Sequence, residues 1–203
     1  MVPDRIISPF GVYVITSKDH VKIAAEACEG GVSIIQYRDK DSKRNEMLRV
    51  AEEIRAITKE NNVLFIVNDF IDIALLSGAD GVHLGQDDIP LERAREITPD
   101  NFIIGISTHS LPQAVEARDK GADYIGIGPV FDTPTKKTYK PIGFSTVKEV
   151  ISRVNIPVVA IGGLNLENIG RLVKIGVKNA AMVREFQQNT AEKVRKANFL
   201  LKV

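Results

Sequence analysis

The sequence has one cysteine, no tryptophan and only 6% aromatic residues. A single cysteine excludes a disulfide within the chain, so folding must rely on the burial of apolar side chains. Cys28 lies in a stretch of helical apolar periodicity, where a small buried side chain is a more typical role than a nucleophile. No apolar run reaches the roughly 20 residues of a membrane-spanning helix, and the first residues lack the layout of a secretory signal. These absences predict a cytoplasmic protein.

An excess of charge of one sign is missing as well. The chain has 27 Lys and Arg against 26 Asp and Glu, and its formal net charge is +1. Such a balance gives no general attraction to nucleic acids or to anionic membranes, so we expect neither as a partner. Any site for an anion must therefore be built locally, from a few side chains that converge.

Short apolar runs alternate regularly with longer amphipathic stretches along the 203 residues. The stretch 45–58, for example, repeats apolar residues at helical spacing. Several of the short runs are apolar nearly throughout, as strands buried on both faces should be. The predicted strands are residues 12–16, 32–37, 64–68, 81–84, 103–107, 124–128, 157–161 and 180–183. Strands that alternate with helices in this way predict an α/β protein with a parallel sheet.

Glycine-containing junctions at residues 29–32, 78–81, 121–124 and 176–179 each close a predicted helix and open a predicted strand. A glycine just past a helix can adopt a positive φ and turn the chain back toward the sheet. The regular spacing of these junctions favours a closed barrel over an open doubly wound sheet. We therefore predict a single (β/α)8 TIM barrel that spans residues 1–203 as one domain, with its chemistry at the C-terminal ends of the strands.

Gln36, Arg38 and Lys40 occupy alternate positions at the end of the second predicted strand. Alternate side chains of an extended strand share one face, so all three are predicted to point together into the barrel mouth. Two cations and an amide suit the oxygens of a diphosphate, with Arg38 as a planar fork and Lys40 as a point charge. The alternative interpretation is a solvated charged loop.

Asp69 and Asp88 follow the third and fourth predicted strands, and Asn68 directly precedes Asp69. Mg²⁺ typically takes one or two protein carboxylates and completes its octahedron with water and substrate phosphate. Beside a cationic diphosphate clamp, the two carboxylates predict a Mg²⁺ site. Each aspartate taken alone is better interpreted as a helix N-cap, because a helical pattern follows each of them.

Two further strand-end loops contain groups that suit a phosphate. Residues 133–138 offer hydroxyls, backbone amides and lysines, although a plain surface loop has the same composition. Gly162 and Gly163 follow the seventh predicted strand, where backbone amides can approach a phosphate at a helix N-terminus. A simple turn remains the alternative for Gly163.

The three histidines differ in their expected roles. His109 follows the fifth strand and fits a general acid or base, but Ser110 beside it predicts a helix N-cap, which weakens that interpretation. His83 lies within a strand, where a satisfied core histidine is the more typical role. His20 is expected at the surface.

Taken in order, these motifs resemble the thiamine-phosphate synthase family, from Tyr13 to about Val183. The matching segments are Gln-Tyr-Arg-Asp-Lys at 36–40, Asn-Asp at 68–69, Ile-Gly-Gly at 161–163, and residues 81–88, 105–109 and 133–137. The resemblance implies a transferase of thiamine biosynthesis that binds two phosphorylated small molecules. It would couple hydroxymethylpyrimidine diphosphate to thiazole phosphate and release pyrophosphate, with Mg²⁺ as cofactor.

The resemblance also implies a role for individual residues. The pyrimidine diphosphate would be held by Gln36, Arg38, Lys40, Asn68, Ser107 and Lys136. Among these, the groups that would act in catalysis are Arg38, Lys40, Ser107 and Lys136, while Asp69 and Asp88 would bind Mg²⁺. The thiazole phosphate would be held by Thr133, Thr135, Gly163, Val183 and Arg184. Arg184 is a departure, because the family usually has a small residue, commonly serine, at this position.

Three alternatives share the barrel fold. A thiazole tautomerase-like isomerase fits His109 but needs no diphosphate, so the complete clamp and carboxylate pair disfavour it. A non-catalytic phosphate-ligand-binding barrel would follow if Arg184 blocked the pocket. Another phosphosugar barrel enzyme is disfavoured by Gln36 and the two aspartates. The sequence also allows a homo-oligomer.

Overall fold

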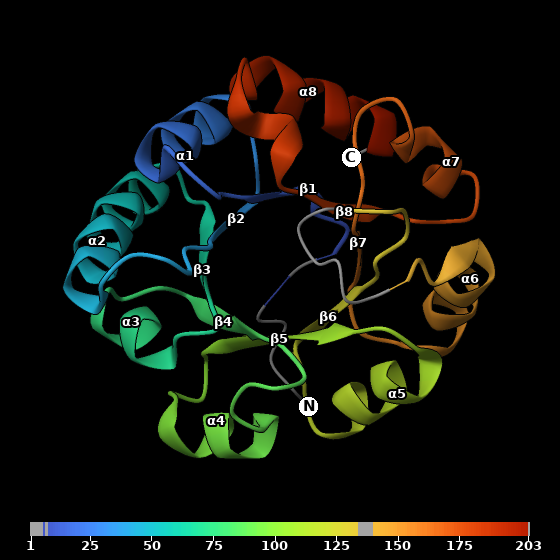
Figure 1. Ribbon diagram of the computed structural model, residues 1–203, viewed down its shortest axis with the longest axis horizontal. Helices are drawn as coiled ribbons and strands as arrows, with labels where there is room; N and C mark the ends of the chain where they lie inside the picture. Colours follow the sequence, from blue (N-terminus) through green and yellow to red (C-terminus); the bar gives the residue numbers. More distant parts are fainter. Residues whose placement is uncertain (1–5, 7, 134–139, 203) are drawn as a thin grey trace.

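The computed structural model describes residues 6, 8–133 and 140–202. Eight parallel strands pair in chain order and β1 also pairs with β8, so the sheet closes into a barrel surrounded by helices (Figure 1). The strands are β1 (Gly11–Ile15), β2 (Ile34–Tyr37), β3 (Leu64–Asn68), β4 (Gly81–Leu84), β5 (Ile103–Thr108), β6 (Tyr124–Ile127), β7 (Val158–Ile161) and β8 (Asn179–Met182). The helices are α1 (His20–Glu29), α2 (Arg44–Glu60), α3 (Ile71–Leu76), α4 (Leu91–Ile97), α5 (Leu111–Asp119), α6 (Gly143–Arg153), α7 (Ile169–Val173), α8 (Thr190–Leu201) and the short 3₁₀ helix η2 (Arg184–Gln187).

The predicted (β/α)8 barrel is confirmed, and every predicted strand overlaps an observed one. The differences lie at the ends of elements, where hydrogen bonding rather than hydrophobicity sets the boundary. The strand predicted at 32–37 begins only at Ile34, where pairing with Tyr13 of β1 and Leu64 of β3 starts. The helix predicted at 45–58 extends to both sides, as α2. The glycines of the helix-to-strand junctions have positive φ values, as expected: Gly31 79°, Gly78 68°, Gly121 89° and Gly176 97°.

Apolar side chains pack in two shells, one inside the barrel and one between the strands and the helices. The inner shell contains two tyrosines, Tyr13 and Tyr124, whose side chains are fully buried. Tyr124 fits because Gly105 lies beside it: a Cβ atom at Gly105 would lie 2.1 Å from the Tyr124 ring. A glycine in β5 thus makes room for a phenol to cross the barrel interior. This places a polar hydroxyl within the apolar core.

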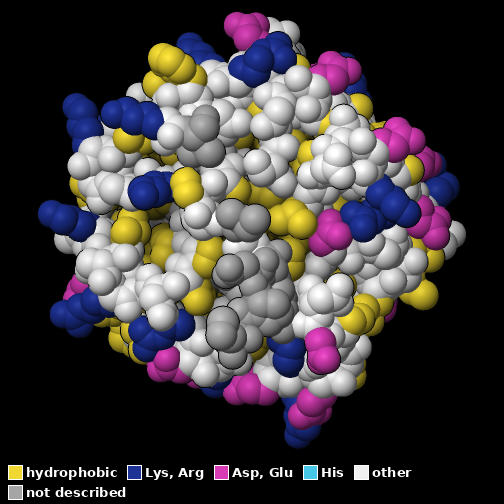
Figure 2. Space-filling model, turned by 180° about the vertical axis from the view of Figure 1, so that it is seen from behind, with side chains coloured by type: hydrophobic (Ala, Val, Ile, Leu, Met, Phe, Trp, Pro, Cys, Tyr) yellow, Lys and Arg dark blue, Asp and Glu magenta, His cyan; other side chains and the backbone are white. Residues whose placement is uncertain are grey.

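The described helices include none that is both long and apolar enough to cross a membrane. Figure 2 shows the face of the molecule opposite to that of Figure 1. Basic and acidic side chains both occur around its periphery, so neither sign of charge covers that face. This mixture agrees with the near-equal numbers of basic and acidic residues in the sequence.

Candidate active site

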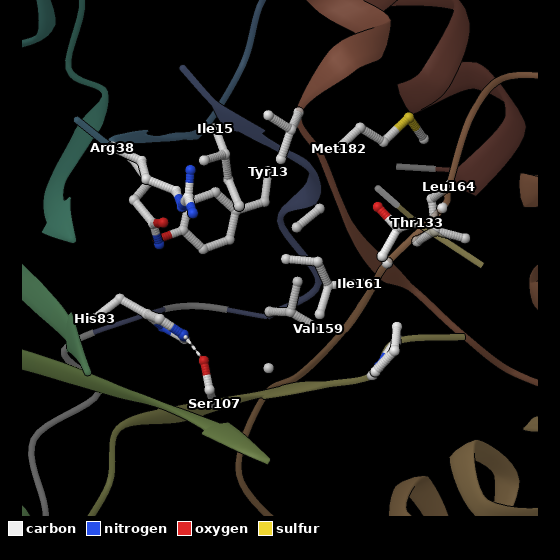
Figure 3. Close-up of a pocket in the computed structure, with 18 of the residues that line it drawn as sticks. Tyr13, Ile15, Arg38, His83, Ser107, Thr133, Val159, Ile161, Leu164 and Met182 are labelled. Carbon is white, nitrogen blue, oxygen red and sulfur yellow. Dashed lines mark hydrogen bonds between the residues drawn. The ribbon is translucent and has the colours of Figure 1, made fainter. Parts of the chain in front are cut away.

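A pocket of about 370 Å³ opens at the C-terminal ends of the strands, where barrel chemistry was expected. Several predicted substrate-binding residues line it together: Gln36, Arg38, Asn68, Ser107, Thr133, Gly163, Val183 and Arg184. Figure 3 shows Arg38, which follows β2, and His83 and Ser107, which lie in β4 and β5, pointing into the same space. Two predicted residues, Thr135 and Lys136, lie outside the described part of the chain. The fold therefore gathers residues that are far apart in the sequence around one cavity.

A chain of hydrogen bonds crosses the floor of this pocket from β2 to β5. The side-chain amide of Gln36 donates through Nε2 to the hydroxyl of Tyr13 at 3.0 Å. The Tyr13 hydroxyl lies 2.8 Å from that of Tyr124, which lies 3.0 Å from Nδ1 of His83. Nε2 of His83 in turn lies 2.9 Å from Oγ of Ser107 (Figure 3). Two predicted substrate ligands, Gln36 and Ser107, are thus connected through the barrel interior.

Burial keeps the two phenols of this chain protonated. Because both side chains are withdrawn from water, the pKa of Tyr13 and that of Tyr124 are raised well above their usual value. Each hydroxyl therefore carries its proton at neutral pH. Each hydroxyl thus has one proton to donate, and this limits the directions that the hydrogen bonds can take.

Asn68 contributes an unsatisfied donor to the pocket. The residue is 8% exposed, and its side-chain Nδ2 has no hydrogen-bond partner among the described residues. A buried amide without a partner costs about 1–3 kcal/mol, and such a group in a pocket is typical of a ligand contact. The predicted binding role of Asn68 is consistent with this geometry.

Asp39 fixes the loop that carries Arg38 and Lys40. Its carboxylate accepts hydrogen bonds from the backbone N–H groups of Asp41 at 3.0 Å and Ser42 at 3.1 Å, and from the Tyr37 hydroxyl at 3.1 Å. Burial alone would raise the pKa of Asp39, but the hydrogen bonds from Ser42, Asp41 and Tyr37 lower it to about 2. The carboxylate is therefore ionised throughout the physiological range and holds the turn in one conformation.

The same cluster shows that the prediction for His20 was wrong. His20 is half-buried, and its Nδ1 lies 2.7 Å from the hydroxyl of Thr16. Its ring packs edge-on against Tyr37, with the ring centroids 4.8 Å apart. Burial, which outweighs the raising effect of the Asp39 charge, lowers the pKa of His20. The histidine thus packs beneath the loop rather than on the surface.

Lys40 does not line the pocket with Gln36 and Arg38. The alternation expected of an extended strand ends with β2 at Tyr37, and the ammonium group of Lys40 lies 3.0 Å from a carboxylate oxygen of Asp69. Lys40 thus stands at the rim, beside the predicted metal ligands.

Asp69 and Asp88 lie close enough for their carboxyl groups to interact. Partial burial raises the pKa of Asp88, the N–H of Gly85 lowers it through a 2.6 Å hydrogen bond, and the adjacent Asp69 raises it again. Asp69 itself has a left-handed backbone, with φ of 64°, which is unusual for a residue other than glycine. Two carboxyl groups held together against their repulsion suit a divalent cation.

The alternative of N-capping aspartates is wrong at both positions. Phe70 occupies the N-cap of α3 and Pro90 that of α4, and no side-chain hydrogen bond caps either helix. Ser110, by contrast, caps α5 as predicted and accepts a hydrogen bond from the N–H of Gln113. Without a capping role for the two aspartates, the interpretation as metal ligands gains weight.

The opposite wall of the pocket is formed by the ends of β7 and β8. Gly163 has a φ of 67°, and a Cβ atom there would lie 2.6 Å from the carbonyl oxygen of Asp132. Only glycine fits this close approach of two loops. Arg184 opens η2 at the end of β8, and Lys193 of α8 reaches the same region, donating to the Glu185 carbonyl at 2.7 Å. This wall is backbone-rich, and it contains Arg184 together with an ion pair in which the ammonium group of Lys193 lies 3.3 Å from the Glu185 carboxylate.

His109 also lines the pocket, at the end of β5. Its Nδ1 lies 2.5 Å from the carbonyl oxygen of Gly128, and its backbone N–H donates to Gln113 at 2.7 Å. Because a carbonyl can only accept, Nδ1 carries a proton. The histidine is oriented by the fold, as a residue beside a helix N-cap would be.

Tyr13, Tyr124, His83 and Lys193 were missed as pocket residues. Three of them lie within strands, and His83 was interpreted as part of the core. Its position between Gly81 and Gly85 in the strand alternation would have placed it on the inner face of the barrel. Lys193 had no comparable signal, because it reaches the pocket from the first turn of α8 and not from the end of a strand.

The closed barrel, with Arg38, Arg184 and Lys193 lining a pocket at its strand ends, is typical of an enzyme that acts on phosphorylated small molecules. The family model for thiamine monophosphate synthase matches residues 12–186. Thiamine-phosphate synthase of Pyrococcus abyssi is 49% identical over 175 residues, which cover 85% of this chain and 84% of that protein. The protein of that name from Dictyoglomus thermophilum is 41% identical over 199 residues, which cover 94% and 89% of the two chains.

A solved structure agrees with these matches. Thiamine phosphate pyrophosphorylase from Pyrococcus furiosus superimposes with a TM-score of 0.88 at 39% identity, covering 95% of this chain and 96% of the other. The chain therefore belongs to the thiamine-phosphate synthase family, and it is an enzyme of the transferase class. Neither the isomerase nor the non-catalytic alternative finds support in these comparisons.

Proposed function

We propose that this chain joins hydroxymethylpyrimidine diphosphate to thiazole phosphate, forms thiamine phosphate and releases pyrophosphate. One observation carries the proposal: three features lie together at one end of the barrel. They are Arg38, the buried Nδ2 of Asn68, which has no partner among the described residues, and the cluster of Lys40, Asp69 and Asp88. Cationic donors beside a pair of carboxylates suit a diphosphate better than any uncharged ligand.

The pyrimidine diphosphate would occupy the side of the pocket formed by β2, β3 and β5. Arg38 and Lys40 would neutralise the diphosphate, with Lys136 as a third cation. Asn68 would satisfy its buried Nδ2 on a substrate acceptor, and Ser107 would donate from its hydroxyl. Gln36, at the buried end of the same wall, would contact the pyrimidine.

Mg²⁺ would be held by Asp69 and Asp88. The residues fit the ion: burial and the adjacent charge of Asp69 both raise the pKa of Asp88, and a divalent cation would offset both effects. When bound, Mg²⁺ supplies positive charge to the diphosphate oxygens. Lys40 would keep its ion pair with Asp69 and add charge at the same edge.

The thiazole phosphate would bind at the opposite wall. The backbone amides around Gly163 and Val183 can approach a phosphate closely, and Thr133 and Thr135 would add hydroxyl donors. Arg184 would add a charge-assisted contact, in place of the small residue usual in the family.

The chemistry needs no nucleophilic side chain, because the thiazole nitrogen of the second substrate is itself the nucleophile. As the bond from the pyrimidine methylene to the diphosphate breaks, negative charge grows on the leaving group and positive charge on the carbon. Arg38, Lys40 and Lys136 would stabilise the leaving diphosphate electrostatically. The thiazole nitrogen then forms the new bond to that carbon.

An end-point assay with both substrates, with and without Mg²⁺, tests the proposal through the appearance of thiamine phosphate. Arg38→Ala should raise the KM for the pyrimidine diphosphate about tenfold to a hundredfold, because an ion-paired contact is lost, and should leave that for thiazole phosphate unchanged. Arg93→Ala, an exposed arginine paired with Glu96, is the matched control and should behave as wild type. If Arg38→Ala raised the KM for both substrates equally, the assignment of Arg38 to the diphosphate would be contradicted.

A further inference from the structure

The hydrogen-bonded chain across the barrel floor has a direction that can be worked out atom by atom. It begins at Gln36 Nε2, an amide nitrogen that can donate but cannot accept. Tyr13 therefore accepts this bond with its oxygen. The one proton of the Tyr13 hydroxyl is then available for its other contact, with the Tyr124 hydroxyl.

The same reasoning continues to the histidine. If Tyr124 accepts from Tyr13, its own proton is directed to Nδ1 of His83, at 3.0 Å. Nδ1 must then be unprotonated, so the proton of the neutral imidazole is on Nε2. The opposite direction would leave the Tyr13 proton without an acceptor among the described contacts of this chain. Because both buried phenols stay protonated, the Tyr13 proton needs an acceptor in either direction, and only the first direction gives it one.

The chain ends at Ser107. Nε2–H of His83 donates to Oγ of Ser107 at 2.9 Å, so the serine oxygen has an acceptor site filled from inside the barrel. The proton of the serine hydroxyl is then left for a partner on the pocket side. A serine held in this way is a hydrogen-bond donor toward a ligand, whereas a serine that donated to His83 would present only lone pairs.

We propose that His83 is a positioning residue: as the neutral Nε2–H tautomer, it holds the Ser107 hydroxyl as a donor toward the substrate diphosphate. Gln36, Tyr13 and Tyr124 set that tautomer from the far side of the barrel. The proposal rests on the proposed function in one respect, namely that Ser107 contacts the diphosphate. The tautomer itself is a property of the protein without substrate.

Nitrogen-15 NMR of histidine-labelled protein, without substrate, tests the tautomer. The chain has three histidines, so the His83 signals can be identified by their loss in His83→Asn. We expect an unprotonated Nδ1 and a protonated Nε2 at neutral pH. Tyr124→Phe, which removes the donor to Nδ1, should shift the signals toward the Nδ1–H form. A wild-type His83 protonated on Nδ1 would overturn the proposal, whatever reaction the enzyme catalyses.

Kinetics test the action through Ser107. An asparagine amide overlays Nδ1 of histidine and can still accept from Tyr124, but it cannot reach Ser107; a glutamine Nε2 overlays histidine Nε2 and can donate to it. His83→Asn should therefore lower kcat/KM for the pyrimidine diphosphate about tenfold to a hundredfold. His83→Gln should retain most of the wild-type kcat/KM. The KM for thiazole phosphate should stay unchanged in both His83 variants.

The double variant separates positioning from general damage to the fold. If His83 acts through Ser107, His83→Asn combined with Ser107→Ala should be no slower than Ser107→Ala alone. The positioning role would be refuted if the losses in kcat/KM of the two single variants multiplied in the double variant. It would also be refuted if His83→Gln were as slow as His83→Asn. If wild-type enzyme makes no thiamine phosphate, the proposed function fails, and the NMR result still decides the tautomer.

Discussion

The ammonium group of Lys40 lies 3.0 Å from the carboxylate of Asp69, joining the loop after β2 to the end of β3. The lysine side chain is 48% exposed, and an ion pair so open to water contributes little to stability. Its position is therefore better explained by the site than by the fold. It sets a positive charge beside two carboxyl groups and links the diphosphate clamp to the predicted metal ligands.

Mg²⁺ should stabilise the enzyme through Asp69 and Asp88. A ligand present at a hundred times its Kd adds about 2.7 kcal/mol to the free energy of unfolding, which a thermal melt with and without Mg²⁺ will detect. Asp69→Asn and Asp88→Asn should each lose most of this gain and most of the Mg²⁺-dependent turnover. Asp72→Asn, which changes an exposed acid on α3, is the control. A full Mg²⁺ response in both site variants would remove the metal assignment.

The Mg²⁺ response should depend on pH in a defined direction. Because the pKa of Asp88 is raised in the folded protein, the folded state holds this proton more tightly than the unfolded chain does, where the pKa is about 3.9. Without Mg²⁺, ionisation of Asp88 thus costs stability as the pH rises through its folded pKa.

Mg²⁺ needs the ionised carboxylate, so its stabilising effect should grow over the same pH range. Melts at a series of pH values above about 4 will show the trend. Without Mg²⁺, the wild-type protein should lose stability as the pH rises through the folded pKa of Asp88, and Asp88→Asn should not show this loss. A Mg²⁺ effect that is constant with pH would contradict the coupling.

Asp39→Ala should weaken diphosphate binding although Asp39 does not line the pocket. Loss of its hydrogen bonds to Asp41, Ser42 and Tyr37 frees the turn that carries Arg38 and Lys40. Since the pKa of Asp39 is lowered to about 2, its stabilisation is present above about pH 4 and is lost as the pH falls toward 2.

We expect the free energy of unfolding of Asp39→Ala at pH 7 to fall by on the order of 1–2 kcal/mol, after allowance for solvent screening. The KM for the pyrimidine diphosphate should rise severalfold. Asp41→Ala, an exposed neighbour in the same loop, should change neither quantity. An unaltered KM in Asp39→Ala would show that the loop holds its shape without this carboxylate.

Gly163→Ala should disturb both the fold and the phosphate wall. The added Cβ would lie 2.6 Å from the Asp132 carbonyl, on a backbone with positive φ, so a loss of about 1–3 kcal/mol is expected. The KM for thiazole phosphate should rise as well. Gly170→Ala in α7 meets no atom within 4 Å and should be neutral or up to about 1 kcal/mol more stable. Chemical denaturation and steady-state kinetics measure both effects.

The amino-acid sequence by itself determined the barrel and the ends of the strands at which polar residues gather. Apolar runs, helical periodicity and glycine junctions are local patterns. They are sufficient to predict that Gln36 and Asn68 lie at the ends of strands. The carboxylates of Asp69 and Asp88 could be proposed as ligands on the same basis. None of these inferences required knowledge of which strands face each other across the barrel.

Tertiary structure alone decided which groups meet. Tyr13 and Tyr124 are 111 positions apart and His83 and Tyr124 are 41 positions apart, and their hydroxyl and imidazole groups come together only when the sheet closes. The pairing of Lys40 with Asp69 depended likewise on where β2 ends. Periodicity fixes the face on which a side chain lies, but the partner on that face is set by the curvature of the barrel and by the space that neighbours such as Gly105 leave open.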